Sequence, residues 1–336
     1  MKRILPLFLA LALLLTGCTV VSTTETTSQT VSQVDSPSSA PESASSQLES
    51  AGEVSITDSN GSQITLDTSA PRVVAAYGSF AEAWLLAGGE LVGVTQDALE
   101  QRDLGLPEDI AVVGTVKEPN AEEIIALEPD LVLLASDITA QADIRDVLEN
   151  AGLACAFFQV DTFADYAFMM EQLCAITGRE DLYEENVTQV GQQIEEAQAN
   201  AALSSTRPNV LLIRAFSTGI KAKTDDELAG AILKDLGAHN IADDHPSMLE
   251  DLSLEEVIAA DPDYIFVTTM GDEQKALDYL NGLIQQNPAW SELSAVKEDR
   301  YIVLPKDLFH YKPNNRWGES YQYLGEILYP QLFHEE

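Results

Sequence analysis

The densest group of side chains suited to ligand binding lies near the carboxyl end of the chain. Between Phe309 and Trp317 the sequence holds three aromatic residues, one histidine and two cations, namely Phe309, His310, Tyr311, Lys312, Arg316 and Trp317. Cations bind anionic groups, and flat aromatic faces contact planar or charged ligands. His310 is either a hydrogen-bonding residue or an axial metal ligand. Trp317 is either a contact residue or part of the core, since it opens a predicted helix.

A second candidate is Arg214, which directly follows the buried-type strand Val210–Ile213. A charge at the end of such a strand is costly unless it meets a partner. We therefore expect Arg214 to contact an anionic ligand that supplies its counter-charge. Lys221 and Lys223 come soon after, and they either reach the same crevice or lie on a solvated hairpin.

The sequence lacks the common motifs of catalysis. It contains no phosphate-binding G-x-x-x-x-G-K-[ST] loop, no G-x-G-x-x-G turn and no G-x-S-x-G elbow. The histidines do not pair at the spacing of a helical zinc site. Cys155 and Cys174 lie in apolar segments, which favours buried, inert thiols over a disulfide. We therefore expect a binding protein rather than an enzyme, with no cofactor and no directly bound metal ion.

The charge of the chain narrows the class of ligand. In 336 residues there are 18 Lys and Arg against 55 Asp and Glu, which gives a formal net charge of −37. Such a surface repels nucleic acid and anionic lipid. An anionic ligand would need a local basic pocket inside this negative field.

The amino-terminal segment has the features of an export signal. Lys2 and Arg3 precede the apolar run Ile4–Leu15, which would span about 18 Å as a helix, against about 30 Å for a bilayer core. The run ends in Leu15-Thr16-Gly17-Cys18, which resembles a bacterial lipobox. We expect residues 1–17 to be a signal peptide and Cys18 to carry lipid.

A polar segment follows the predicted lipid site. Nearly half of residues 19–52 are Ser or Thr, and the segment has no aromatic residue, Lys or Arg. It cannot bury enough apolar surface to offset its chain entropy. We expect residues 18–52 to form a disordered tether between the membrane and the folded part.

The folded part opens with signals for strands and a helix. Val54–Thr57 and Gln63–Leu66 alternate around a turn sequence and predict a hairpin. The apolar runs Val73–Ala76 and Leu91–Val94 predict buried strands on either side of the helix Phe80–Ala87. Alternating strands and helices indicate α/β architecture with parallel sheets.

A fifteen-residue segment occurs twice. Residues 120–134 and 253–267 share six identities, and most other positions keep their apolar or acidic class. In each copy Asn120 or Ser253 is a good helix N-cap, and two glutamates fill the first turn. A Pro-Asp pair then stops the short helix before an apolar strand. The chain therefore contains two α/β lobes of similar topology.

A polar segment from Leu182 to Leu203 separates the lobes and reads as one long helix. We expect an amino-terminal lobe at residues 53–165, a bridging helix region at 166–206 and a carboxyl-terminal lobe at 207–336.

The order of several short motifs resembles that of a known family. They are Pro71–Val74, Gly114–Thr115, Pro119–Glu122, Ala126–Val132 and Leu236–Ala242. Over residues 53–330 the chain resembles the substrate-binding lipoproteins of ABC importers, in the iron-siderophore, haem and cobalamin group. The resemblance implies two Rossmann-like lobes joined by a single long helix, with a ligand cleft between them. It also implies that Glu122 and Glu255 pair with arginines on a permease dimer, and that the protein is a monomer.

The loops after the strands should line this cleft. The residues expected to bind ligand are Tyr77, Arg214, Phe216, Met270, His310, Tyr311, Lys312 and Arg316.

Several ligands fit such a cleft. An anionic ferric siderophore fits its cations and aromatic faces best. Haem would need an axial pair such as Tyr77 with His310. Cobalamin fits less well, because the loop Thr115–Lys117 lacks the tryptophan found in cobalamin-type members. We expect the protein to hold its ligand on the outer face of the cell membrane, and a lipoprotein for sensing or adhesion without transport stays open.

Overall fold

The computed structural model describes residues 52–250, 252 and 254–333. The predicted signal peptide, the lipid site Cys18, nearly all of the predicted tether and the N-cap Ser253 lie outside these residues. Within the described part of the chain, none of the helices has the length and apolar character needed to cross a bilayer.

The first sheet is parallel throughout and is built from five short strands. Its order is β5 (Ala111–Val112), β4 (Leu91–Val94), β3 (Val73–Ala75), β8 (Leu131–Ala135) and β9 (Ala154–Phe158). Almost every residue of β3, β8 and the edge strand β9 is buried. Such continuous apolar strands are typical of a parallel sheet that helices cover on both faces.

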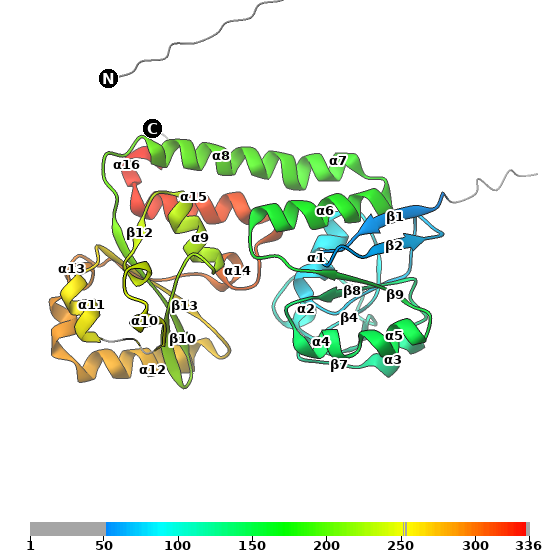
Figure 1. Cartoon of the computed structure of the whole chain (residues 1–336), viewed down its shortest axis with the longest axis horizontal. Helices are drawn as coiled ribbons and strands as arrows, with labels where there is room; N and C mark the ends of the chain where they lie inside the picture. Colours follow the sequence, from blue (N-terminus) through cyan, green and yellow to red (C-terminus); the bar gives the residue numbers. More distant parts are fainter. Residues whose placement is uncertain (1–51, 251, 253, 334–336) are drawn as a thin grey trace, which may run out of the picture. The chain divides into compact units, whose positions relative to one another are not determined.

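Alternate residues of this sheet enter two different cores. One face, with Val73 and Ala75, packs against α1 (Gly78–Leu86), α6 (Phe163–Thr177) and the hairpin of β1 (Val54–Thr57) and β2 (Gln63–Leu66). The other face, with Val74 and Ala76, packs against α3 (Ala121–Ala126) and α5 (Arg145–Asn150). This sheet and its helices are called the first lobe below (Figure 1).

The second lobe is built around a sheet of similar topology. Its main order is β11 (Gly219–Lys223), β10 (Asn209–Phe216), β13 (Tyr264–Thr269) and β14 (Tyr301–Val303), with β12 (His239–Asn240) also paired to β10. All pairs are parallel except β10 with β11. This hairpin is a difference from the first lobe, in which a helix follows the corresponding strand directly. A turn at Ser217 and Thr218 makes the hairpin.

Helices cover both faces of the second sheet as well. Val210, Leu212 and Phe266 face α9 (Leu228–Asp235) and α15 (Trp317–Leu328). Leu211 and Ile213 face α11 (Leu254–Ala260) and α12 (Glu273–Gln286). The predicted α/β class with parallel sheets is therefore confirmed.

The remaining elements are short. They are α2 (Asp97–Glu100), β6 (Gly114–Thr115), β7 (Glu118–Pro119), α4 (Thr139–Asp143), η2 (Ile241–Asp243), α10 (Ser247–Glu250), η3 (Pro288–Glu292), α13 (Ser294–Lys297), α14 (Lys306–Phe309), η4 (Asn314–Arg316) and α16 (Pro330–Phe333).

The described parts of the two repeat copies share two backbone features. Glu128 and Asp261 both adopt positive φ, 47° and 42°, just before the Pro-Asp pair. Asp130 Oδ2 then accepts a hydrogen bond from the backbone N–H of Arg72 at 2.7 Å. In the same way Asp263 Oδ2 accepts from the N–H of Asn209 at 2.8 Å. Each aspartate therefore ties the end of the repeat to the first strand of its lobe.

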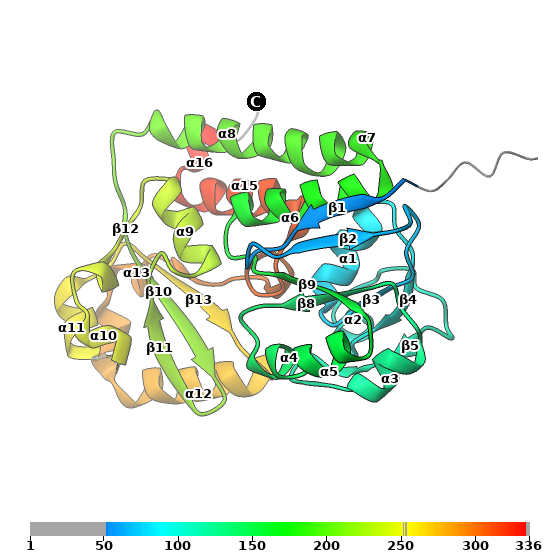
Figure 2. The same ribbon diagram turned by 45° about the vertical axis from the view of Figure 1, so that its right-hand side comes forward.

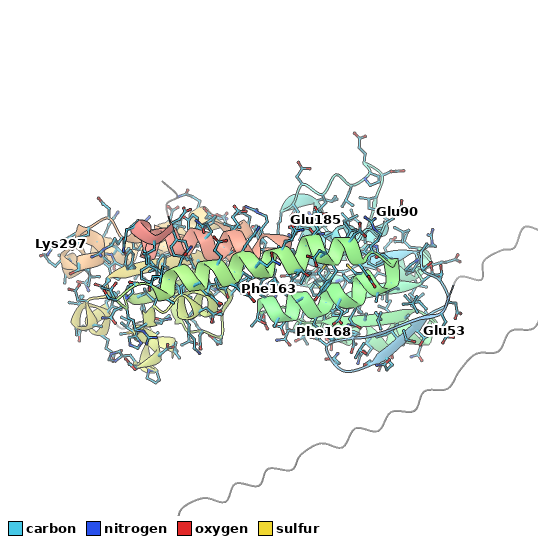
Figure 3. All side chains as sticks on the ribbon, turned by 90° about the horizontal axis from the view of Figure 1, so that it is seen from above. Glu53, Glu90, Phe163, Phe168, Glu185 and Lys297 are labelled. Atoms are coloured by element: carbon cyan, nitrogen blue, oxygen red, sulfur yellow. The ribbon has the colours of Figure 1, made fainter. Side chains whose placement is uncertain are left out.

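A continuous helical segment links the two lobes. α6 ends at Gly178, whose φ of 69° is left-handed. The chain then forms α7 (Glu180–Tyr183), the π-helical turn η1 (Glu184–Thr188) and α8 (Gln189–Ala202), and helical dihedral angles persist at Tyr183 and Thr188. The expected helix at Leu182–Leu203 thus starts earlier and contains one wider turn. α15 lies alongside α8, as seen from above in Figure 3.

One hydrophobic core runs through both lobes. It includes Val73 of β3, Val190 and Ile194 of α8, Trp317 of α15 and Val210 of β10. Separating the lobes would expose this apolar surface, which costs about 25 cal/mol per Å2.

The continuous helix and the shared core lead to a prediction about motion. Hinge closure needs a few residues that absorb large backbone changes, and the segment Glu180–Ala202 offers few. Crystal structures with and without ligand should differ by a small rotation of the lobes. A large clamshell closure would show that the bridging segment is not stiff.

Candidate functional site

The carboxyl ends of the parallel strands meet where the two lobes face each other. In the first lobe, β3, β4, β8 and β9 are followed by Tyr77, Asp97, Asp137 and Asp161. In the second lobe, Arg214 lies inside β10, which runs on to Phe216 instead of ending at Ile213. Met270 directly follows β13, and Lys306–Tyr311 follows β14. The segment that carries α14 runs between the two sheets (Figures 1 and 2). This meeting place, defined by these residues and Lys312, is called the junction below.

A short segment after α14 is bonded to the first lobe. The side-chain amide of Asn314 donates to Ser79 O at 2.9 Å and to Glu82 Oε2 at 2.6 Å. Its carbonyl oxygen accepts from the Ser79 hydroxyl at 3.3 Å. Asn314 is fully buried and has a φ of 51°. Residues Tyr311–Asn314 are called the crossover segment below, since they join the two lobes.

Two cations hold the same segment. The Arg102 guanidinium donates to the Glu82 carboxylate, to Tyr311 O and to Lys312 O. Lys312 has a φ of 61°, and its ammonium group donates to Val160 O and to Asp161 Oδ1. Side-chain and backbone groups about 150–235 positions away in the sequence therefore hold the unusual backbone of the crossover segment.

A pocket opens beside the crossover segment. Its volume is ≈ 330 Å3. Its walls come from both lobes and consist of Glu82, Gln101, Arg102, Asp103, Asp307, Tyr311, Pro313 and Arg316.

Tyr77 lies among acidic groups. Burial and the negative charges of Asp137, Asp97 and Asp161 together raise the pKa of its phenol to about 12, against the opposing effect of Arg102. The Tyr77 hydroxyl is therefore protonated at neutral pH and can donate a hydrogen bond. Its ring meets Phe80 edge-on, with the centroids 5.3 Å apart.

His310 lies among basic groups. Burial and the positive charges of Arg214, Lys306 and Lys312 together lower the pKa of its imidazole to about 4. The ring is therefore neutral at pH 7 and keeps one nitrogen lone pair free to accept a hydrogen bond or bind a metal. The Tyr311 ring lies 5.2 Å from it, and the Lys306 ammonium lies 5.9 Å from the Tyr311 centroid.

Arg214 has a protein counter-charge, which corrects one expectation. Its guanidinium donates to Glu227 Oε1 at 3.0 Å and more weakly to Thr268 Oγ1 at 3.4 Å. Lys223 Nζ also pairs with Glu227, at 2.6 Å. The ligand is therefore not needed to neutralise Arg214. The β10–β11 hairpin brings Lys223 back toward Arg214, so the single carboxylate of Glu227 is shared between two cations.

Arg316 is neutralised in the same way. It donates to both carboxylate oxygens of Glu319, at 2.7 and 2.8 Å, and to Asp307 Oδ2 at 2.8 Å. Two carboxylates thus surround one guanidinium, which leaves Arg316 less able to attract an anion than Lys306, whose ammonium donates to Gly271 O.

The other predicted residues have simpler positions. Met270 is 38% exposed at the end of β13, and Phe216 is half-buried at the end of β10. Trp317 is buried against Phe163 in the core, which matches one of its two interpretations. Lys221 is exposed on the hairpin.

Neither cysteine of the described chain forms a disulfide. Both Cys155 and Cys174 are buried free thiols. Burial raises their pKa to about 12 and about 11, so they stay protonated and unreactive. The expectation of inert thiols is confirmed.

Residues 52–250, 252 and 254–333 contain no cluster of three or more His, Cys, Asp or Glu side chains arranged to hold a metal ion.

The two glutamates expected to contact a permease occupy matching places. Glu122 and Glu255 are exposed in the first turns of α3 and α11. The Asn120 side chain caps α3 by accepting from the N–H groups of Glu122 and Glu123.

Two α/β lobes whose parallel strands end at one junction are the arrangement expected of a solute-binding protein. A model of the Periplasmic binding protein family matches residues 73–308, and the chain belongs to this family of extracytoplasmic solute-binding proteins. The Fe(3+)-citrate-binding protein YfmC of Bacillus subtilis (strain 168) is 26% identical over 273 residues, which cover 78% of this chain and 82% of the relative. The High-affinity heme uptake system protein IsdE of Staphylococcus aureus (strain MRSA252) is 22% identical over 224 residues, with coverages of 66% and 75%.

A solved structure shows the same fold. The crystal structure of Staphylococcus aureus SirA complexed with staphyloferrin B superposes with a TM-score of 0.62 and 20% identity, and covers 84% of this chain and 99% of its own. The predicted family and fold are therefore confirmed.

Sequence reasoning missed several residues that hold or neutralise residues of the junction. Glu82, Arg102, Asn314 and Glu227 act only through partners that the fold brings close. One signal was available: Lys312 and Asn314 stand next to Pro313 in a segment rich in turn residues, where positive φ is common.

The low pKa of His310 predicts a pH effect on stability. The folded-state pKa, about 4, lies below the usual 6.5, so the unfolded chain binds a proton that the folded chain does not. Stability is therefore lost as pH falls from about 6.5 toward 4, by at most about 2 kcal/mol down to pH 5. Urea unfolding at pH 7 and pH 5 should show a smaller loss for His310→Gln than for the wild type. Equal losses would mean that His310 titrates normally.

Proposed function

We propose that this protein captures a ferric chelate outside the cytoplasmic membrane and delivers it to an ABC permease. The observation that carries the proposal is the junction, where Tyr77, His310 and Tyr311 lie among charged groups from both lobes. Aromatic faces and charge-assisted donors are suited to a large polar chelate. The named ligands of YfmC, IsdE and SirA, all iron-containing or iron-chelating molecules, support this choice.

The iron would arrive inside its chelate. The described residues hold no side-chain cluster for a bare metal ion, so the protein would contact the organic shell. Acidic groups of a siderophore would meet Arg214 and Lys306 of the second lobe, and Tyr311, Phe216 and Met270 would supply apolar contacts. Lys312 and Arg316 would act mainly at the edge, because protein carboxylates already pair with them.

Haem is the second candidate, and the neutral imidazole of His310 favours it. A neutral imidazole with a free lone pair is the form that binds haem iron. Tyr77, on the facing lobe, would be the second axial ligand. An absorbance spectrum of the haem-loaded protein would distinguish this mode, since His310→Ala should shift the Soret band only if His310 binds the iron.

The remaining roles follow from the proposed transport. The protein would act as a monomer without enzyme activity, on the outer face of the cytoplasmic membrane. Cys18 would carry the lipid that anchors it there, and residues 18–52 would separate the folded part from the membrane.

The function is tested first by ligand binding. Ferric siderophores that bind should quench the intrinsic fluorescence of the full-length chain during a titration. Arg214→Ala should weaken this binding about tenfold or more, because one charge-assisted hydrogen bond contributes about 1.5–3 kcal/mol. Lys297→Ala, which removes a cation on α13, is the matched control and should bind normally. If no iron chelate and no haem binds, the proposed function is wrong.

Delivery is tested by reversing the charge of the two matching glutamates. Glu122→Arg with Glu255→Arg should abolish iron uptake by cells and leave ligand affinity intact, since a pseudo-twofold protein would meet a permease dimer symmetrically. Glu108→Arg with Glu195→Arg reverses two other exposed acids and should leave uptake unchanged. A loss of affinity in the first variant would place these glutamates at the ligand instead.

The anchor is tested by fractionation. Two acyl chains give stable membrane attachment, whereas one gives marginal binding. Cys18→Ala should move the protein from the membrane to the soluble fraction, and Cys155→Ala should not. Unchanged membrane attachment of Cys18→Ala would refute lipid modification at this residue.

A further inference from the structure

The charges at the junction are divided between the two lobes. Most of them are already paired within the protein. In the first lobe the Glu82 carboxylate pairs with Arg102, and the Asp161 carboxylate pairs with Lys312 of the crossover segment. These pairs leave no net charge for a ligand, so the groups that remain unpaired decide which ligand fits.

Two carboxylates of the first lobe that lie at the junction, Asp97 and Asp137, form no ion pair with the described residues. Asp97 is only 8% exposed, and its Oδ2 accepts a hydrogen bond from the N–H of Gly78 at 2.7 Å. Its Oδ1 is buried and has no hydrogen-bond partner within the described chain. Asp137, at the end of β8, is exposed and likewise forms no ion pair with the described residues. Both carboxylates lie near enough to Tyr77 to raise the pKa of its hydroxyl group.

The second lobe has an excess of positive charge at the junction. Arg214 and Lys223 share the single carboxylate of Glu227, so one positive charge is left over. Lys306 donates to Gly271 O at 2.6 Å and has no carboxylate partner within the described chain. Both Arg214 and Lys306 lower the pKa of His310, so this excess positive charge lies at the junction.

Resting on the function proposed above, we infer that the ligand is a ferric chelate of mixed charge, with an acidic group at one end and a protonated amine at the other. The acidic group binds Arg214 and Lys306 of the second lobe, and the amine binds Asp97 and Asp137 of the first. The sequence alone indicated a purely anionic chelate, and the unpaired carboxylates opposite the cations change that expectation.

The electrostatic reason lies in the first lobe. A chelate with acids on every side would bring one of them against Asp97 and Asp137, and like charges in contact are strongly unfavourable. An ammonium group there would donate to the unpartnered Oδ1 of Asp97, which otherwise remains a buried acceptor without a bond. The protonated hydroxyl of Tyr77 would add a donor beside them.

The test uses four ferric trihydroxamates that share one linear core and differ only at their ends. One carries a terminal carboxylate, one a terminal ammonium, one both, and one neither. Ferric citrate is the fifth probe, since it carries acidic groups without an amine. Binding to the full-length chain is measured by fluorescence titration at fixed ionic strength.

The doubly charged chelate should bind about tenfold or more tightly than either singly charged one. Asp137→Asn, at an exposed position where folding is not at risk, should weaken binding of the two ammonium-bearing chelates and leave the carboxylate-only chelate unchanged. Asp97→Asn should do the same, since its amide oxygen can still accept from Gly78. Asp109→Asn removes an exposed acid that follows no junction strand, and it should have no effect.

Two results would overturn the inference and leave the proposed function standing. One is equal binding of the carboxylate-only and doubly charged chelates, and the other is binding of ferric citrate alone. Failure of all five probes to bind would reject the inference together with the proposal of ferric chelate capture.

Discussion

The attachment of the crossover segment to the first lobe is the constraint on which the junction depends. Asn314 is buried with a left-handed backbone, and its amide group reaches Ser79 and Glu82. Arg102 holds the carbonyl groups of Tyr311 and Lys312. These bonds offset the energetic cost of holding Lys312 and Asn314, which are not glycines, at positive φ. Under the proposed function, the side chains that would face a ligand are therefore positioned by groups that would not contact it.

The rest of the fold supplies a rigid frame for this contact. The two lobes share one local arrangement, in which a Pro-Asp pair follows a short helix. The aspartate carboxylate then accepts a backbone hydrogen bond from the start of the first strand of its sheet. A single core then runs from β3 through α8 and α15 to β10. Because the lobes share apolar surface and a continuous helix, we expect the junction to be largely formed before a ligand binds. Preorganisation of this kind lowers the ordering cost of binding.

Local sequence signals predicted the fold well. The hairpin of β1 and β2, the helix cap at Asn120 and the strands after each Pro-Asp pair depend on neighbouring residues, so they can be read from short segments. The junction was predicted only in part. Tyr77, Arg214 and His310 were identified because strand ends must meet at one edge of a sheet. The balance of charge was missed, because Glu227 and Asp97 acquire their roles from tertiary contacts that no spacing reveals.

The central claim is that the junction between the lobes holds the iron of a chelate. Anomalous diffraction at the iron absorption edge, from crystals of the protein with a bound ferric chelate, locates this atom directly. The account predicts one iron peak between Tyr77 of the first lobe and the His310–Tyr311 segment of the second. An iron peak at any other part of the surface, or bound chelate with no iron at the junction, would contradict it.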